Sequence, residues 1–153
     1  MSLEMDRLRL EQTSKALQAF APRLDRRMPS GGWLRAVREA LGRTQRQQAA
    51  RLNIAAPTLA KSEKAEADGR ITVAQLRKLA AGLDCELVYT LVPRRPLSEQ
   101  VEQQAERIAR QEVLGVSHTM QLEDQQPSDE FILRQIQQRR QQLLAGKWSH
   151  LWR

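Results

Sequence analysis

The chain has 153 residues, a formal net charge of +7 and a sequence pI near 10.5. This length allows one domain, or a small core with appendages. Aromatic residues make up only 4% and there are seven glycines, which disfavours an all-β sandwich or barrel. The polar N-terminus and the lack of an apolar run of 18 residues predict a cytoplasmic protein with neither a secretory signal nor a membrane span. One cysteine and two histidines argue against a disulfide framework or a zinc site, so we expect no cofactor.

The positive charge is concentrated in the middle of the chain. Residues 33–93 carry ten basic and six acidic residues, a net +4, against +2 for residues 1–32 and +1 for residues 94–153. A basic region of this kind is typical of proteins that bind nucleic acids. Because many soluble domains are mildly basic, the charge by itself also fits a domain without such a ligand.

The first predicted element is an N-terminal helix. Residues 3–20 place Leu3, Leu10 and Leu17 at a spacing of seven, which indicates an amphipathic helix. Proline and glycine residues between positions 22 and 32 break this pattern and mark a linker. We therefore interpret residues 1–32 as a helix followed by a linker.

Four short helices are expected next. Gly42 stands where a left-handed residue ends the first of them, and Thr44 and Thr72 are suited to cap the second and the fourth. The third begins near Pro57, which suits a first helical turn. The expected ranges are 33–41, 44–52, 56–65 and 72–83.

The apolar period then changes from 3.6 to 2 over residues 86–92, which predicts a strand ended by Pro93. No second strand of similar quality occurs in the sequence. Because a lone strand leaves its N–H and C=O groups unpaired, we expect it to pair with the same strand of a second copy as an antiparallel ribbon. The residues expected at this homodimer contact are Leu87, Val88, Tyr89, Thr90 and Leu91.

Residues 94–153 form a glutamine-rich C-terminal helical arm, which holds 12 of the 18 glutamines. One helix is predicted from Leu97 to about Leu114, and another follows a turn that ends in a good N-cap. Polar faces dominate both, which indicates arms that pack on the core or on a partner. The tail with Trp148 and Trp152 either docks on the protein's own helices or anchors a partner.

The helices at 44–52 and 56–65 are separated by a short turn, which is the helix-turn-helix pattern. Ala49 and Ala50 are small enough for two helices to cross, and Asn53 tolerates left-handed turn geometry. Ile54 and Leu59 are suited to fill the core between the helices. The following Glu63 is interpreted as a structural ion-pair or cap residue.

This string, from Thr44 to Glu63, resembles the Cro/CI-type (XRE) helix-turn-helix family of phage repressors. The resemblance implies a lambda-repressor-like fold over residues 33–93. The expected fold class is therefore mainly α, a helix-turn-helix bundle with one β-strand and flanking N- and C-terminal helices.

The whole chain also resembles the family called mobile mystery protein A. The resemblance rests on residues 32–42, 63–72, 83–93 and 118–125, and on the terminal Leu151-Trp152. In that family the gene is paired with a downstream gene for a Fic-domain protein, often on mobile elements. The resemblance therefore implies an antitoxin-like regulator with a Fic-domain partner.

The family pattern assigns roles at double-stranded DNA. The start of the first motif helix is expected to hold phosphate through its N–H groups and dipole. The start of the second, the recognition helix, is expected near base edges in the major groove. The DNA-binding residues expected on this basis are Arg43, Thr44, Gln45, Arg46, Ala56, Pro57, Thr58, Lys61 and Lys64. Arg51 and Arg70 are further phosphate candidates, with a solvated surface charge as the alternative.

The recognition helix departs from the family pattern at its N-cap. Ala55 stands where many members have serine, which costs about 1 kcal/mol of helix stability and removes a hydroxyl that could reach phosphate. Sequence recognition is therefore expected to depend on few polar residues, on DNA shape, or on Arg26 and Arg27 of the preceding linker.

The expected function is a dimeric, sequence-specific DNA-binding regulator that represses its own operon from a palindromic operator, at the nucleoid. We expect no enzymatic activity and neither a catalytic nor a metal site. The alternative is an antitoxin that binds and restrains the Fic-domain partner directly, with DNA binding secondary. No segment fits the Ser/Thr-x-x-x-Glu-Gly/Asn pattern of one type of Fic-inhibiting antitoxin.

Overall fold

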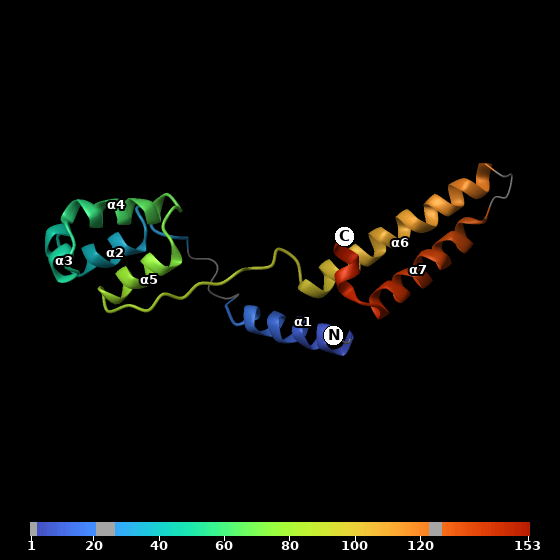
Figure 1. Ribbon diagram of the computed structural model, residues 1–153, viewed down its shortest axis with the longest axis horizontal. Helices are drawn as coiled ribbons and strands as arrows, with labels where there is room; N and C mark the ends of the chain where they lie inside the picture. The colour runs from blue at the N-terminus through green and yellow to red at the C-terminus, as the bar shows by residue number, and fades with distance from the viewer. Residues whose placement is uncertain (1–2, 21–26, 123–126) are drawn as a thin grey trace. The chain divides into compact units, whose positions relative to one another are not determined.

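The computed structural model describes residues 3–20, 27–122 and 127–153 (Figure 1). Over these ranges it consists of seven α-helices and a short 3-10 helix, with no β-strand. None of the described helices is both long and apolar enough to span a bilayer. The elements are α1 (Leu3–Gln18), α2 (Trp33–Ala40), α3 (Gln45–Arg51), α4 (Ala56–Ala67), α5 (Val73–Ala81), α6 (Leu97–Leu122), α7 (Asp129–Ala145) and the 3-10 helix η2 (Trp148–Trp152).

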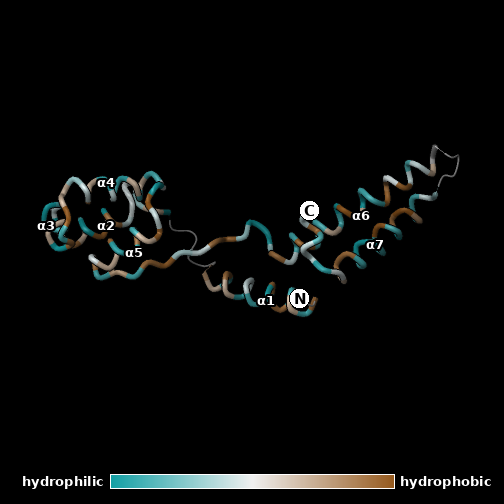
Figure 2. Tube along the Cα trace, viewed as in Figure 1, coloured by the Kyte–Doolittle hydropathy of each residue, from teal (hydrophilic) through white to brown (hydrophobic). Residues whose placement is uncertain are grey.

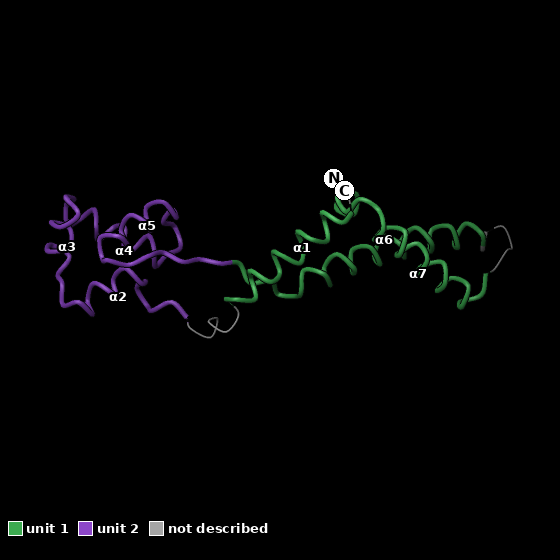
Figure 3. The backbone as a smooth tube through the Cα atoms, turned by 90° about the horizontal axis from the view of Figure 1, so that it is seen from below, with its two compact units in different colours: residues 1–21, 91–153 green, residues 22–90 purple. Residues whose placement is uncertain are grey.

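The chain divides into two compact units (Figure 3). The middle unit, residues 22–90, contains α2 to α5. The outer unit, residues 1–21 and 91–153, contains α1, α6, α7 and η2. The outer unit thus joins segments that lie on both sides of the middle unit in the sequence.

The core of the middle unit is built from all four of its helices. Leu34, Ala49, Leu59, Leu79 and Leu83 are buried together. A second set of apolar side chains is partly buried against them and includes Ile54 of the turn. The expected packing roles of Ala49, Ile54 and Leu59 are therefore confirmed, whereas Ala50, also expected at the helix crossing, is exposed.

The predicted caps and left-handed residues of this unit are also confirmed, whereas α4 continues to Ala67, past the predicted end at 65, and α5 ends at Ala81, before the predicted end at 83. The Thr44 and Thr72 hydroxyls accept hydrogen bonds from the backbone N–H groups of Gln47 and Gln75. Gly42 and Asn53 have φ angles of 69° and 54°, the left-handed conformation that ends one helix and turns the chain after another.

A residue of α4 caps the start of α2. The buried Glu66 carboxylate accepts the N–H groups of Trp33 at 2.6 Å and of Leu34 at 2.9 Å. A carboxylate is favourable at a helix N-terminus because the helix dipole is positive there. Gly32 leaves room for it, since a Cβ there would lie 3.0 Å from the carboxylate carbon. This contact ties the first helix of the unit to the third.

The strand predicted at residues 86–92 is not formed in the single chain, so this part of the expected fold class is wrong. Residues 85–93 are neither helix nor strand, and no other described segment offers a ladder for them to join. The alternating pattern only shows that the segment can be extended, whereas a strand also needs a neighbour. Figure 2 shows that much of this segment is hydrophobic.

The outer unit is a helical hairpin with two additions. Helices α6 and α7 pack along each other, α1 packs on α6, and η2 packs on both hairpin helices (Figures 1 and 3). Val101, Ala105 and Leu151 form its buried cluster, and Leu10 of α1 and Trp148 pack against them. The tail therefore docks on the protein's own helices, although Trp152 remains 58% exposed.

Helix α6 extends to Leu122, past the end predicted near Leu114. Gly115 costs a helix interior about 1 kcal/mol relative to alanine, which favours an earlier end. Packing along α7 offsets that cost, because Ser117 beyond the glycine is buried. The local signal was therefore overridden by tertiary contact.

Candidate nucleic-acid interface

The start of α3 is held by a reciprocal capping box. The Thr44 hydroxyl accepts the Gln47 N–H at 3.2 Å, and the Gln47 side-chain oxygen accepts the Thr44 N–H at 2.9 Å. Arg46, in the same first turn, is exposed. Because the helix dipole places partial positive charge here, the start of α3 is suited to an anion such as a phosphate.

Gln45 is fixed by a contact to α4. It is half-buried, and its side-chain amide donates to Glu63 Oε2 at 3.0 Å. The amide therefore has one orientation set from within the protein. The spacing between the start of α3 and α4 is fixed through the same bond.

Glu63 belongs to a buried ion pair. Arg38 donates from Nε to Glu63 Oε1 at 2.5 Å and from Nη2 to Oε2 at 3.1 Å, and both side chains are almost fully buried. Arg38 also donates to the carbonyl oxygen of Arg43 at 2.8 Å. The interpretation of Glu63 as an ion-pair residue is thus confirmed, whereas its partner was not identified. The sequence did indicate that Arg38 is buried, since it lies four residues after the core residue Leu34 on the same helix face.

Helix α4 presents most of the predicted base-contacting residues to solvent. Pro57, Thr58, Lys61 and Lys64 are exposed. Ala56 is different, because it is half-buried and packs against the core of the middle unit. The Ala55 N-cap makes no side-chain capping bond, as its methyl group dictates.

Three of the predicted DNA-binding residues line one basic hollow. The α4–α5 hollow has a volume of about 420 Å³ and includes Thr58, Lys61 and Lys64 together with Arg70, Thr72 and Gln75. Arg70 forms an exposed ion pair with Asp68 at 2.9 Å, so part of its charge is balanced within the protein. The hollow adjoins the exposed face of α4 and adds positive charge to it.

The other predicted contacts lie apart from this hollow. Arg43 is half-buried and donates to the Gln48 side chain at 3.0 Å, while Arg51 is exposed on α3. Arg27 is exposed, and Arg26 lies outside the described residues.

The five residues expected at the dimer contact all lie in the extended segment 85–93. Val88, Tyr89 and Leu91 are 60%, 65% and 79% exposed, and Leu87 and Thr90 are half-buried. A succession of exposed apolar side chains is uncommon on the surface of a monomer.

Sequence reasoning missed the buried Gln48. This residue is 1% exposed, and its amide donates to the Gly82 carbonyl oxygen at 2.9 Å, which links α3 to the end of α5. A Cβ at Gly82 would come within 2.2 Å of Leu52, so the glycine permits this close approach. Gln48 lies four residues before Leu52 on one helix face, and that spacing was a usable signal.

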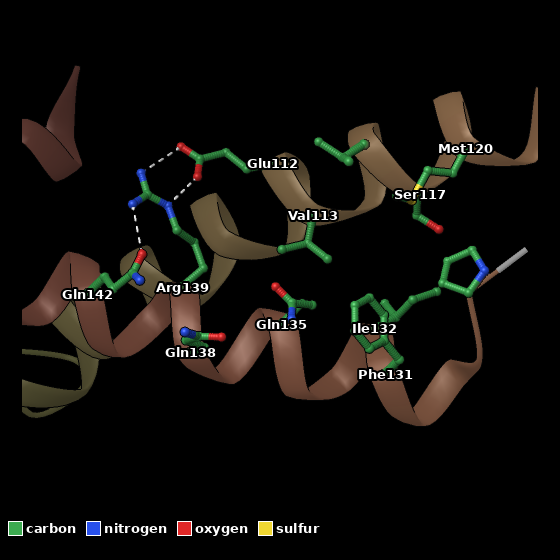
Figure 4. Close-up of a pocket in the computed structure, with 12 residues that line it drawn as sticks. Glu112, Val113, Ser117, Met120, Phe131, Ile132, Gln135, Gln138, Arg139 and Gln142 are labelled. Atoms are coloured by element: carbon green, nitrogen blue, oxygen red, sulfur yellow. Dashed lines mark hydrogen bonds and ion pairs between the residues drawn. The ribbon is translucent and has the colours of Figure 1, made fainter. Parts of the chain in front are cut away.

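A second, mainly apolar hollow of about 390 Å³ lies between α6 and α7 in the outer unit (Figure 4). Val113, Phe131 and Ile132 line it, and Arg139 pairs with Glu112 at one end. The hydrogen bond to Glu112 raises the pKa of Arg139 above its already high ordinary value, so the pair stays charged. Among the described side chains, no group of three His, Cys, Asp or Glu is placed to hold a metal ion.

Residues 34–89 match a family model described as helix-turn-helix. No curated protein and no solved structure matches the chain. The chain therefore contains a helix-turn-helix domain of Cro/CI type, which is typical of DNA-binding, non-enzymatic transcriptional regulators. The match covers α2 from its second residue, then α3, α4 and α5, and it ends within the extended segment.

Proposed function

We propose that this chain, whose residues 34–89 form a Cro/CI-type helix-turn-helix domain, is a sequence-specific transcriptional repressor. The observation that carries the proposal is the exposure of Pro57, Thr58 and Lys61 on α4, beside a start of α3 that is fixed by its capping box. Helix α4 enters the major groove, and the start of α3 holds a flanking phosphate.

The side chains define which bases they can recognise. The Lys61 ammonium group donates to the O6 and N7 atoms of guanine, and the Thr58 methyl group contacts the methyl group of thymine. Arg46 and Lys64 are exposed and hold phosphates, and Gln45 acts beside them in the orientation set by Glu63. Ala56 mainly serves the core.

Lys61→Ala is expected to weaken binding to operator DNA by about 1–3 kcal/mol, or roughly 5- to 150-fold, because the hydrogen bonds to one base are removed. The measurement is fluorescence anisotropy on a duplex taken from the DNA upstream of the protein's own gene, with an unrelated duplex alongside. Lys78→Ala removes the same charge from an exposed site on α5 and is the matched control. Equal losses for both variants, or equal losses on both duplexes, would contradict the assignment of Lys61 to a base.

We infer further that the regulated operon is the protein's own and includes a gene for a Fic-domain protein; the resemblance to mobile mystery protein A supports this. A second candidate function is direct binding and restraint of that Fic protein. The apolar α6–α7 hollow, with Phe131 44% exposed, favours it as a protein-binding surface. The Lys61→Ala variant separates the two: a repressor loses control of its operon, whereas a direct inhibitor still protects cells from the Fic protein.

The repressor is proposed to act as a homodimer through the extended segment 85–93. Val88, Tyr89 and Val92 expose apolar surface there, and burial against a second copy removes it from water. A dimer also matches a palindromic operator with half-sites one helical turn apart.

Tyr89→Asp combined with Leu91→Asp is expected to convert the dimer to a monomer, because the contact would then have to bury charged side chains in place of apolar ones. Light scattering gives the mass, and energy transfer between copies labelled at the single, exposed Cys85 gives a second measure. Val73→Asp, which changes an exposed apolar residue on α5, is the control. A native chain that stays monomeric while it saturates a palindromic operator rules this dimer out.

A further inference from the structure

The outer unit carries a second positively charged hollow that the helix-turn-helix domain does not explain. It has a volume of about 460 Å³ and is lined by Arg94, Arg95, Arg107, Trp152 and the amides of Gln100, Gln103 and Gln104. All of these residues belong to the outer unit. We call it the arginine hollow.

The lining is built from the start of α6 and the end of the chain. Arg95 donates to the Gln103 side chain, Gln100 donates to the Arg95 carbonyl oxygen, and Arg107 donates to Gln104. The Gln104 amide donates to the Leu151 carbonyl oxygen, which holds the last turn beside α6. The guanidinium groups of Arg95 and Arg107 are thus oriented by neutral amides, one of which, Gln103, donates in turn to Glu99 outside the lining.

No carboxylate lines the hollow, and within the described part of the chain none of its three arginines forms an ion pair. Other arginines of the outer unit behave differently, since Arg110, Arg139 and Arg140 each pair with a glutamate. Three guanidinium groups without a counter-charge, beside an exposed indole, are complementary to an anion. Arginine in particular matches the oxygens of a phosphate through two parallel N–H donors.

We propose that the arginine hollow binds the phosphate backbone of duplex DNA that flanks the site contacted by α4. The inference rests on the proposed function and extends it to a second contact. In the sequence, Arg94 is the first residue that lines the hollow, and Leu83 is the last buried core residue of the middle unit. Residues 84–93 connect the two. At 3.3–3.6 Å per residue, positions 84–93 span at most about 35 Å, which is close to one turn of duplex. DNA held by α4 is therefore present at high effective concentration for the hollow.

The test compares two duplexes centred on the operator, one short enough to hold only the two half-sites and one extended by a helical turn on each side. Arg94→Gln with Arg107→Gln is the variant. Arg7→Gln with Arg134→Gln, two exposed arginines elsewhere in the outer unit, is the charge-matched control. Affinity is measured by anisotropy across a salt series, and hydrogen exchange of the α6 amides checks that each variant is folded.

The slope of log affinity against log salt falls by about 0.9 for each phosphate that the protein no longer neutralises. We expect a smaller slope for the hollow variant on the long duplex only, and an unchanged slope for the control. Equal slopes for the hollow variant and the native chain on the long duplex would overturn the proposal. This is the result expected if the hollow binds an acidic protein segment instead of DNA. Failure of the proposed function would give a different result. In that case the native protein and the Lys61→Ala variant would bind with equal affinity, and each would bind operator and unrelated DNA equally well.

Discussion

Glu63→Ala is expected to destabilise the middle unit by about 3–5 kcal/mol, because it leaves the buried Arg38 guanidinium with only the exposed Glu39 carboxylate, 3.8 Å away, as a counter-charge. A domain of this size is stable by only about 5–15 kcal/mol, so a large fraction of its stability is lost. The chain has two units, which can unfold separately, so the stability of the middle unit is measured by itself. The measurement is hydrogen exchange of the α2 and α4 amides. The α6 and α7 amides should be unaffected.

The exposed pair of Arg35 and Glu39 supplies the control for this experiment. Arg35→Ala breaks an ion pair of 2.8 Å on the surface of the same unit and keeps Glu39, which also lies 3.8 Å from Arg38, so it should leave amide exchange in α2 and α4 unchanged. A double variant, Arg38→Met with Glu63→Leu, is expected to be more stable than Glu63→Ala because no buried charge is left alone. Similar exchange rates in Glu63→Ala and Arg35→Ala would show that the buried pair contributes little.

Operator affinity is expected to fall by about 10³–10⁵-fold between 50 and 200 mM salt, if the dimer neutralises about six to ten phosphates. Each chain carries +7, so the proposed dimer carries about +14, and more than half of that lies in residues 33–93. The measurement is a titration of operator DNA by anisotropy at several salt concentrations. A loss of less than ten-fold would mean that few phosphates are contacted.

A stability series over the same salt range is the control for this result. If exchange of the α2 and α4 amides is unchanged by salt, the weaker affinity arises at the DNA interface and not from unfolding. The Lys78→Ala variant should keep the native salt slope, since its side chain lies outside the proposed interface.

Local signals predicted the helices of the middle unit well. Threonine caps, a left-handed glycine and a left-handed asparagine act within a few residues of their own positions, and each was found as expected.

Long-range polar contacts were not predictable in the same way. Glu66 caps a helix whose first residue lies 33 positions away, and Gln48 reaches a carbonyl 34 positions away, so no sequence window contains both partners. The strand at 86–92 was overpredicted for a related reason. The alternation of apolar side chains shows that the segment can be extended, but it does not show whether a neighbouring strand is present to pair with it. The arginine hollow similarly joins Trp152 to residues some fifty positions earlier.

The interrupted sequence of the outer unit has a consequence for its biosynthesis. The ribosome completes residues 22–90 before α6 exists, so the middle unit can fold while the chain is still being made. Helix α1 has no buried residue of its own, and its Leu10 packs on Val101, Ala105 and Leu151, all of which are synthesised after the middle unit. An isolated helix of this length is marginal in water. A nascent chain is therefore expected to hold a folded helix-turn-helix domain before the residues on which α1 packs have been synthesised.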